Sequence, residues 1–239
     1  MHNKHLGTDQ YCYASVLEYL VSSVMDSSPQ NNLSEIWLRV QRFNAQHHIS
    51  DGFSNMTLTM FQKNAGDFPC LKGRAIECKR LGPPLFSVCQ ELLDPSDDVH
   101  GAILNMMRCS CRIDEIVEEN AEEFRLPDAA ADEMLMQVSD FLTFLNFLNH
   151  HFRSRLPRVY LFHETIKFHM LMHCALQSRY LNLKLSYCYA GEDLMRIVKK
   201  VVASCCRGTT AHKVLEKFIL KYCTGMNCRM IRQEDWFET

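Results

Sequence analysis

The stretch PDAAADEMLMQVSDFLTFLNFLNHH, residues 127–151, decides the fold class of this chain. Proline suits the first turn of a helix, because the backbone N–H that it lacks would have no intrahelical partner there. Apolar side chains then recur at helical spacing and cover a wide face, formed by Leu135, Val138, Phe141, Leu142, Leu145 and Leu148. A surface helix needs a narrower face. We therefore expect a central core helix in which Phe141, Leu145 and Leu148 are almost fully buried.

The N-terminal part of the chain predicts two further amphipathic helices. Thr8 can cap the first, which runs to about residue 25 and is broken by Ser27-Ser28-Pro29. Ser34 opens the second, which ends near His47-His48. Residues 49–70 contain glycine and proline without sustained periodicity, so they predict a long connection that holds one short helix.

The remaining sequence continues this helical pattern. Gly82-Pro83-Pro84 predicts a bent helix pair over 71–93, because proline cannot donate the helical hydrogen bond. Asp97 and Asp98 are placed to cap the next helix, from 99 toward 117. Later helices are expected over 162–178, 192–206 and 210–224, the last ended by Gly225. Leu183 to Ala190 alternates loosely and is the one strand candidate, although a lone strand needs a partner.

These elements predict a mainly α protein, a multi-helix globular bundle of at least seven helices with at most one or two short strands. The irregular connection allows a domain boundary within it. Residues 1–65 would then form an N-terminal helical region with its connection, and residues 66–239 a helical core with basic C-terminal helices. One single domain over 1–239 is the alternative, since a chain of this length can bury one large core.

Composition bears on where the protein resides. The first residues are polar and lack the apolar stretch and small-residue cleavage site of a signal peptide. No run reaches the roughly 20 apolar residues of a transmembrane helix, so no membrane contact is expected. The sequence predicts an intracellular protein, nuclear or cytoplasmic, whose 12 cysteines stay reduced and are mostly small buried hydrophobes.

Charge is distributed unevenly along the chain. Residues 112–140 hold ten acidic and two basic side chains, whereas residues 194–232 hold nine basic side chains and Glu216 alone as an acid. Two solvated helix faces that attract each other would explain this pattern. A C-terminal surface that faces a polyanion is the alternative. The candidate nucleic-acid-binding residues are Arg196, Lys199, Lys200, Lys213, Lys217 and Lys221.

The sequence holds no complete catalytic motif. It lacks a glycine-rich phosphate loop, a Gly-x-Ser-x-Gly elbow and a kinase signature, so we expect no enzyme and no cofactor. His169 and His173 are four residues apart on an expected helix and are weak candidates for a metal site. Packing and hydrogen bonding are the alternative role, because the Glu of a zinc-hydrolase helix is missing between them. We therefore predict no metal.

The order of several short motifs resembles the C-terminal region of large eukaryotic RNase H-like transposases of the DDE type. These motifs are Phe68 to Glu77, Lys167 to His173, and Ser186 to Glu192, separated by a long helical stretch. In that family a helical insertion separates two catalytic aspartates from a final catalytic glutamate. The resemblance implies that His169 and His173 belong to the family's Lys-x-His-x-Leu-x-His element, and that Glu192 corresponds to the final metal-binding glutamate.

The resemblance also implies an incomplete active site. Residues 1–65 show no Val/Ile-rich strand that ends in Asp, and a lone glutamate cannot hold the two metal ions of such a site. Glu192 would be a remnant, with capping of a helix as its alternative role. We therefore expect a transposase-derived, catalytically incomplete protein or fragment with weak, non-specific nucleic-acid binding. The alternative is a helical protein–protein interaction module unrelated to transposons, with a partner protein as its ligand.

Overall fold

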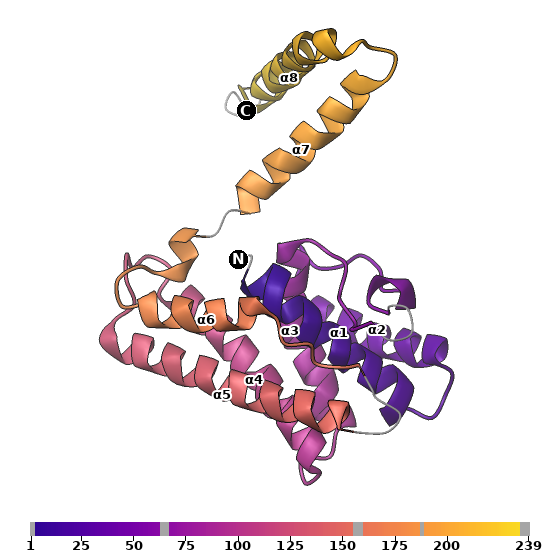
Figure 1. The fold of residues 1–239 in the computed structure, drawn as a ribbon, viewed down its shortest axis with the longest axis vertical. Helices are drawn as coiled ribbons and strands as arrows, with labels where there is room; N and C mark the ends of the chain where they lie inside the picture. The colour runs from indigo at the N-terminus through magenta and orange to yellow at the C-terminus, as the bar shows by residue number, and fades with distance from the viewer. Residues whose placement is uncertain (1–2, 63–66, 155–159, 187–188, 235–239) are drawn as a thin grey trace. The chain divides into compact units, whose positions relative to one another are not determined.

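The computed structural model describes residues 3–62, 67–154, 160–186 and 189–234, with the backbone alone at residues 189–193, 196 and 226–234. Within these residues the chain forms eight α-helices and no strand, which confirms the prediction of a mainly α protein with at least seven helices. The chain consists of two compact units, Met1–Tyr187 and Cys188–Thr239 (Figure 1). None of the described helices is long and apolar enough to cross a membrane.

The first helical segment of unit 1 starts earlier than expected. A π-helical turn at Lys4–Thr8 leads directly into α1, Asp9–Tyr19, and a second π-helical turn follows at Leu20–Val24. Thr8 therefore lies inside the helical segment and does not cap it, because its hydroxyl donates to the carbonyl of Lys4 at 3.2 Å. Most of α1 is buried, which places the N-terminal residues within the core of this unit.

Helix α2 spans Pro29–Gln46 and begins before the expected start at Ser34. The first helical segment ends at Val24, before Ser27-Ser28-Pro29 as predicted, but the second helix begins at Pro29 and Ser34 lies inside it. The hydroxyl of Ser28 accepts a hydrogen bond from the backbone of Asn31, and Pro29 occupies the first helical turn, where its missing N–H has no cost. The long connection that follows contains one short 3₁₀ helix at Leu58–Met60, as predicted.

The prediction for α3 was wrong, whereas that for the start of α4 is confirmed. Pro83 and Pro84 lie inside a single helix, α3, Ala75–Leu92, where two separate helices were expected. Packing against both α1 and α2 holds α3 in place, so residues on either side of position 65 share one core. Helix α4, Asp98–Glu119, is capped as expected, because the Asp97 carboxylate accepts hydrogen bonds from the backbone of Val99 and His100.

The central helix is α5, Asp128–Arg153, which packs along α4 and against α6, Ile166–Gln177 (Figure 1). Phe141, Leu145 and Leu148 are each at most 1% exposed, which confirms the predicted core face. Burial of one such side chain stabilises the fold by about 1.5–3 kcal/mol. The wide apolar face of α5 is thus covered from two directions.

The strand expected at Leu183 to Ala190 does not form in the described residues. Leu183–Ser186 is a 3₁₀ helix, and α7 already begins at Tyr189. Unit 2 is an antiparallel pair of helices, α7, Tyr189–Cys206, and α8, Ala211–Glu234, joined by a connection in which Gly208 has a φ of +63°. Gly225 does not end α8, which continues to Glu234. The α7–α8 pair is called the hairpin below.

Candidate nucleic-acid interface and other polar sites

The hairpin presents basic side chains on both of its helices. Lys199 and Lys200 lie exposed on α7, and Lys213 lies exposed on α8. Within the described part of the hairpin, none of these three ammonium groups makes a hydrogen bond or an ion pair. Glu216 is the single acidic residue between positions 194 and 225, and it is also exposed. Among the described side chains of the hairpin, the positive charge of these lysines therefore has no partner.

Two further lysines of α8 have a structural role as well. The ammonium group of Lys217 donates to the hydroxyl of Thr209 at 2.7 Å, in the connection between the helices. That of Lys221 donates to the hydroxyl of Ser204 at 2.9 Å, in the last turn of α7. Positive charge is favourable at this helix end, where backbone carbonyls lack intrahelical partners. Lys217 and Lys221 thus join α8 to the end of α7.

Two candidate residues of α7 are placed through their backbone only. Glu192 is the fourth residue of α7, within its first turn, and Arg196 lies one turn later. The side chains of both residues lie outside the described part of the structure. The role of Glu192 as a remnant of a metal-binding acid stays a prediction, as does the contribution of Arg196 to a basic surface.

The acidic run of residues 112–140 is largely used inside unit 1. Arg112 is the centre of one network, because its guanidinium contacts Glu115 at 3.2 Å, Glu119 at 2.6 Å and Glu133 at 2.7 Å. Hydrogen bonds that the guanidinium donates to these carboxylates, those to Glu133 above all, raise the pKa of Arg112, and the guanidinium in turn lowers the pKa of Glu133. One arginine thus neutralises carboxylates from two helices, α4 and α5.

Other acids of this run also have partners within unit 1. Glu118 pairs with Lys79 and, at 2.9 Å, with Lys184. Partial burial would raise the pKa of this carboxyl, but the two lysines outweigh it and lower the pKa to about 2. Counting all pairs, seven of the ten acids have a basic partner, namely Asp114, Glu115, Glu118, Glu119, Asp128, Asp132 and Glu133.

His169 and His173 are brought together by α6. Both rings are exposed, and their Nε2 atoms lie 2.8 Å apart. Neighbouring candidates point elsewhere, because Cys174 accepts a hydrogen bond from Asn3 and His163 stacks on Phe68 with ring centroids 4.2 Å apart. The structure therefore confirms that His169 and His173 lie side by side, and this site offers two nitrogen atoms as possible ligands.

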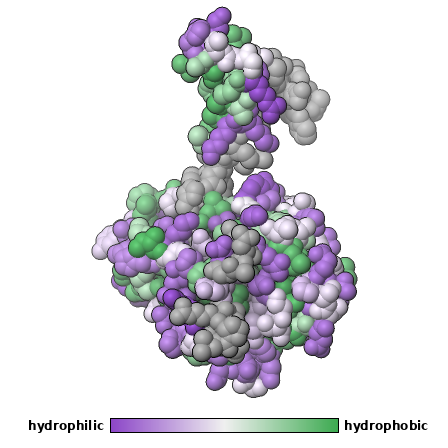
Figure 2. All heavy atoms as spheres, turned by 45° about the vertical axis from the view of Figure 1, so that its right-hand side comes forward, coloured by the Kyte–Doolittle hydropathy of each residue, from purple (hydrophilic) through white to green (hydrophobic). Residues whose placement is uncertain are grey.

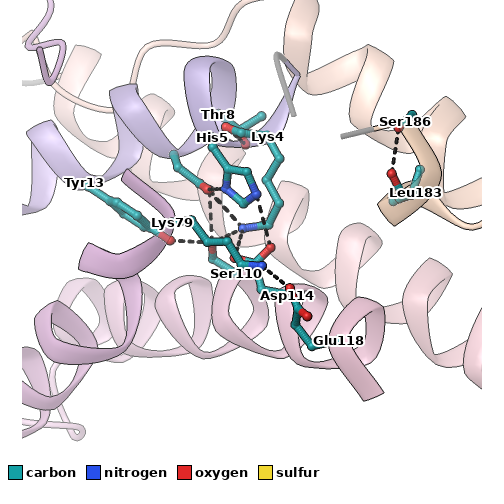
Figure 3. Close-up of polar contacts among 11 residues, drawn as sticks. Lys4, His5, Thr8, Tyr13, Lys79, Ser110, Asp114, Glu118, Leu183 and Ser186 are labelled. Carbon is teal, nitrogen blue, oxygen red and sulfur yellow. Dashed lines mark hydrogen bonds and ion pairs between the residues drawn. The ribbon is translucent and has the colours of Figure 1, made fainter. Parts of the chain in front are cut away.

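A buried polar cluster in unit 1 was not expected from the sequence. The ammonium group of Lys4 lies 3.1 Å from the Asp9 carboxylate, 2.9 Å from Asp114 and 3.2 Å from the Ser110 hydroxyl (Figure 3). Nδ1 of His5 lies 2.8 Å from the same Asp9 carboxylate. The cluster joins the first helical turn of the chain to the middle of α4, more than 100 residues away.

Charge balance explains why this cluster is stable. Burial disfavours the charged form of Lys4, but Asp114 and Asp9 outweigh it and raise the pKa of the ammonium group. Burial likewise opposes charge on Asp9, and the charges of Lys4 and His5 outweigh it, so the pKa of this carboxyl is lowered. Ligand atoms of His5, Asp9 and Asp114 come within 4.8 Å of one another, as in a metal site. The Lys4 ammonium contacts both carboxylates of this group, at 3.1 Å from Asp9 and 2.9 Å from Asp114, so we assign the cluster a structural role.

A signal for the cluster does exist in the sequence. His5 and Asp9 are four residues apart, which is the spacing of neighbours on one helical face. Asp114 gave no such signal, because it is one of ten acids in a dense run and only its position opposite Lys4 distinguishes it.

A cleft of about 460 Å³ opens between α3, α4 and α5, and two thiols line it. Burial raises the pKa of Cys109 to about 11 and that of Cys111 to about 12. Both thiols are therefore protonated near neutral pH, and the thiolate is the nucleophilic form of cysteine. These residues favour packing over covalent catalysis.

Comparison of the chain with protein-family models, with characterised proteins and with solved structures finds no match.

Proposed function

We propose that this chain is a catalytically incomplete, transposase-derived helical protein that binds nucleic acid weakly and without sequence preference through the hairpin. The observation that carries the proposal is a difference in charge pairing. Lys199, Lys200 and Lys213 have no partner within the described hairpin, whereas seven of the ten acids at residues 112–140 are paired inside unit 1. Among those ten acids, Glu122, Glu123 and Asp140 are the ones without an ion pair in the described structure.

Physical chemistry connects this charge to nucleic acid. Each lysine that contacts a phosphate releases condensed counterions, which favours binding irrespective of base sequence. Sequence-independent binding by this mechanism has a dissociation constant of about 10⁻⁴ to 10⁻⁶ M at physiological salt. Lysine ammonium groups bind phosphate oxygens as point charges, so the expected ligand is the phosphate backbone.

The absence of catalysis is part of the same proposal. It rests on the resemblance, in which Glu192 stands without its two aspartate partners. The protonated thiols of the cleft and the Lys4-centred cluster also favour structural roles over chemistry. We expect purified protein with Mg²⁺ or Mn²⁺ to leave labelled DNA uncut. Metal-dependent cleavage that Glu192→Gln abolishes would contradict this expectation.

Titration of a fluorescently labelled DNA duplex at several salt concentrations tests the binding. Each phosphate contact contributes about −0.9 to the slope of log affinity against log salt. Replacing Lys199, Lys200 and Lys213 by glutamine should therefore flatten the slope by up to about 2.7. The hairpin should stay folded in this variant, because the three side chains are exposed and make no hydrogen bond or ion pair with the described part of the hairpin.

A matched control removes the same charge from unit 1. Arg42, Arg80 and Arg108 are exposed on that unit, and their replacement by glutamine changes the net charge equally. The proposal expects the salt slope to stay unchanged in this control. Equal weakening in both triple variants would show that overall charge, and not the hairpin, determines binding.

A second function, binding to a partner protein, is favoured by apolar exposure on the hairpin. Leu215, Ile219 and Leu220 are 65%, 51% and 70% exposed, and Leu215 and Ile219 share one face of α8. Hydrophobic and hydrophilic side chains both reach the surface of this unit (Figure 2). No detectable duplex binding at about 50 mM salt would favour this second function, since electrostatic binding is strong under that condition.

A further inference from the structure

Helix α6 holds two imidazoles in a position that the proposed nucleic-acid binding does not use. His169 and His173 are exposed, their Nε2 atoms lie 2.8 Å apart, and their rings are nearly perpendicular, at 87°. We propose that these two nitrogens form a binding site for one divalent transition metal ion of the class that includes Ni²⁺, Cu²⁺ and Zn²⁺. Neutral imidazole is a preferred ligand of these ions.

The distance between the nitrogens fits a chelate. Metal–imidazole bonds are about 2.0–2.1 Å long, so two such bonds to atoms 2.8 Å apart enclose an angle of about 86°. This angle is close to the right angle between neighbouring ligands in square-planar and octahedral coordination. A tetrahedral ion needs nitrogens about 3.3 Å apart, which requires a small adjustment of the rings. The geometry therefore favours Ni²⁺ and Cu²⁺ over Zn²⁺, in agreement with the general order of affinity.

The helix supplies the preorganisation. Residues four apart lie on the same face, and α6 places both rings in solvent, so a metal ion can reach them without displacing a core side chain. Cys174 is turned toward Asn3 and adds no ligand in this arrangement. Two protein nitrogens leave the remaining coordination positions to water. Such a site binds its ion reversibly and stabilises the folded helix only while the ion is bound.

The same 2.8 Å distance also fits a hydrogen bond, in which one imidazole donates its Nε2–H to the other ring. The hydrogen-bonded pair and the metal-bound pair differ in which nitrogen of each ring carries the proton. A metal ion needs the lone pairs of both Nε2 atoms, so each ring must carry its proton on Nδ1 or lose it. Metal binding therefore replaces this hydrogen bond and places the proton of each ring on Nδ1.

Calorimetric titration of the tag-free full-length protein with NiCl₂ tests the site. Cys206 and Cys223 are replaced by serine in every protein compared, because both thiols are exposed and bind the same ions. We expect one Ni²⁺ per chain, with affinity lowered about tenfold or more by His169→Ala and, separately, by His173→Ala. Circular dichroism should stay unchanged, since both side chains are exposed.

The matched control replaces two other exposed histidines, His47 and His212, by alanine. Ni²⁺ affinity that stays constant in this control and falls in both single variants of the α6 pair supports the site. Equal affinity in all variants overturns it, as does a loss that depends on only one of His169 and His173. Duplex binding by the hairpin is not involved in this titration, so the two proposals succeed or fail separately.

Discussion

Unit 1 and the hairpin differ in how many of their charged side chains form ion pairs. In unit 1, Lys4 is buried between two carboxylates, and Arg112 neutralises acids from two helices. In the hairpin, Lys199, Lys200 and Lys213 face solvent without a partner among the described side chains. A count of charges along the sequence treats both regions alike. In unit 1 these ion pairs are part of the fold, whereas we propose that the three lysines of the hairpin are available to a ligand.

The largest effect that this comparison predicts is the loss of the Lys4 ammonium. Lys4→Ala should lower the free energy of unfolding by about 3–5 kcal/mol, because it leaves two buried carboxylates without their cation. Lys200→Ala should change it by less than about 0.5 kcal/mol. Urea unfolding followed by far-ultraviolet circular dichroism measures the helices of both units, and the fluorescence of Trp37 in a Trp236→Phe background reports unit 1 separately. A similar small change in both variants would remove the contrast between the units.

A change of pH is expected to alter the free energy of unfolding by a smaller amount. The folded pKa of Asp9 is below its usual value of 3.8, so its contribution is fully present above about pH 3.8 and is lost as pH falls through the lowered pKa. The folded pKa of Lys4 is above 10.5, so its contribution is present below that pH and is lost as pH rises through the raised pKa. The contribution of both groups should be constant from pH 5 to 9. Unfolding free energies measured across pH should show this plateau, and Asp9→Asn should reduce the loss on the acid side.

The smallest predicted effect is the loss of the ion pairs of Arg112, which lie at the surface and not in the core. Arg112→Ala removes contacts to three glutamates, but these carboxylates are partly exposed and screened by solvent. We expect a loss of about 1 kcal/mol or less in the same urea experiment. A loss near that of Lys4→Ala would mean that the acidic run, as well as the buried cluster, holds α4 and α5 together.

Periodicity predicted the centre of the fold. The apolar face of residues 127–151 was sufficient to identify α5 as the core helix, and Asp97 identified the start of α4. Local signals failed where one residue type serves two roles. Ser34 was expected to begin a helix that in fact begins at Pro29, Pro83 lies within one helix, and Gly225 continues another. Each of these outcomes is decided by the segments that pack nearby or by caps, which a single-residue signal does not contain.

For the candidate sites too, some features followed from the sequence and others only from the structure. The spacing of His169 and His173 determined that they share a helical face, and the clustering of lysines determined that the C-terminal helices are basic. Only the tertiary structure decided which charges stay available. It brought Lys4 to Asp114 across more than 100 residues and paired the acids of residues 112–140 within unit 1. Helical periodicity is a local property of the sequence, whereas the partner of a charge depends on which distant segments the packing of apolar faces brings together.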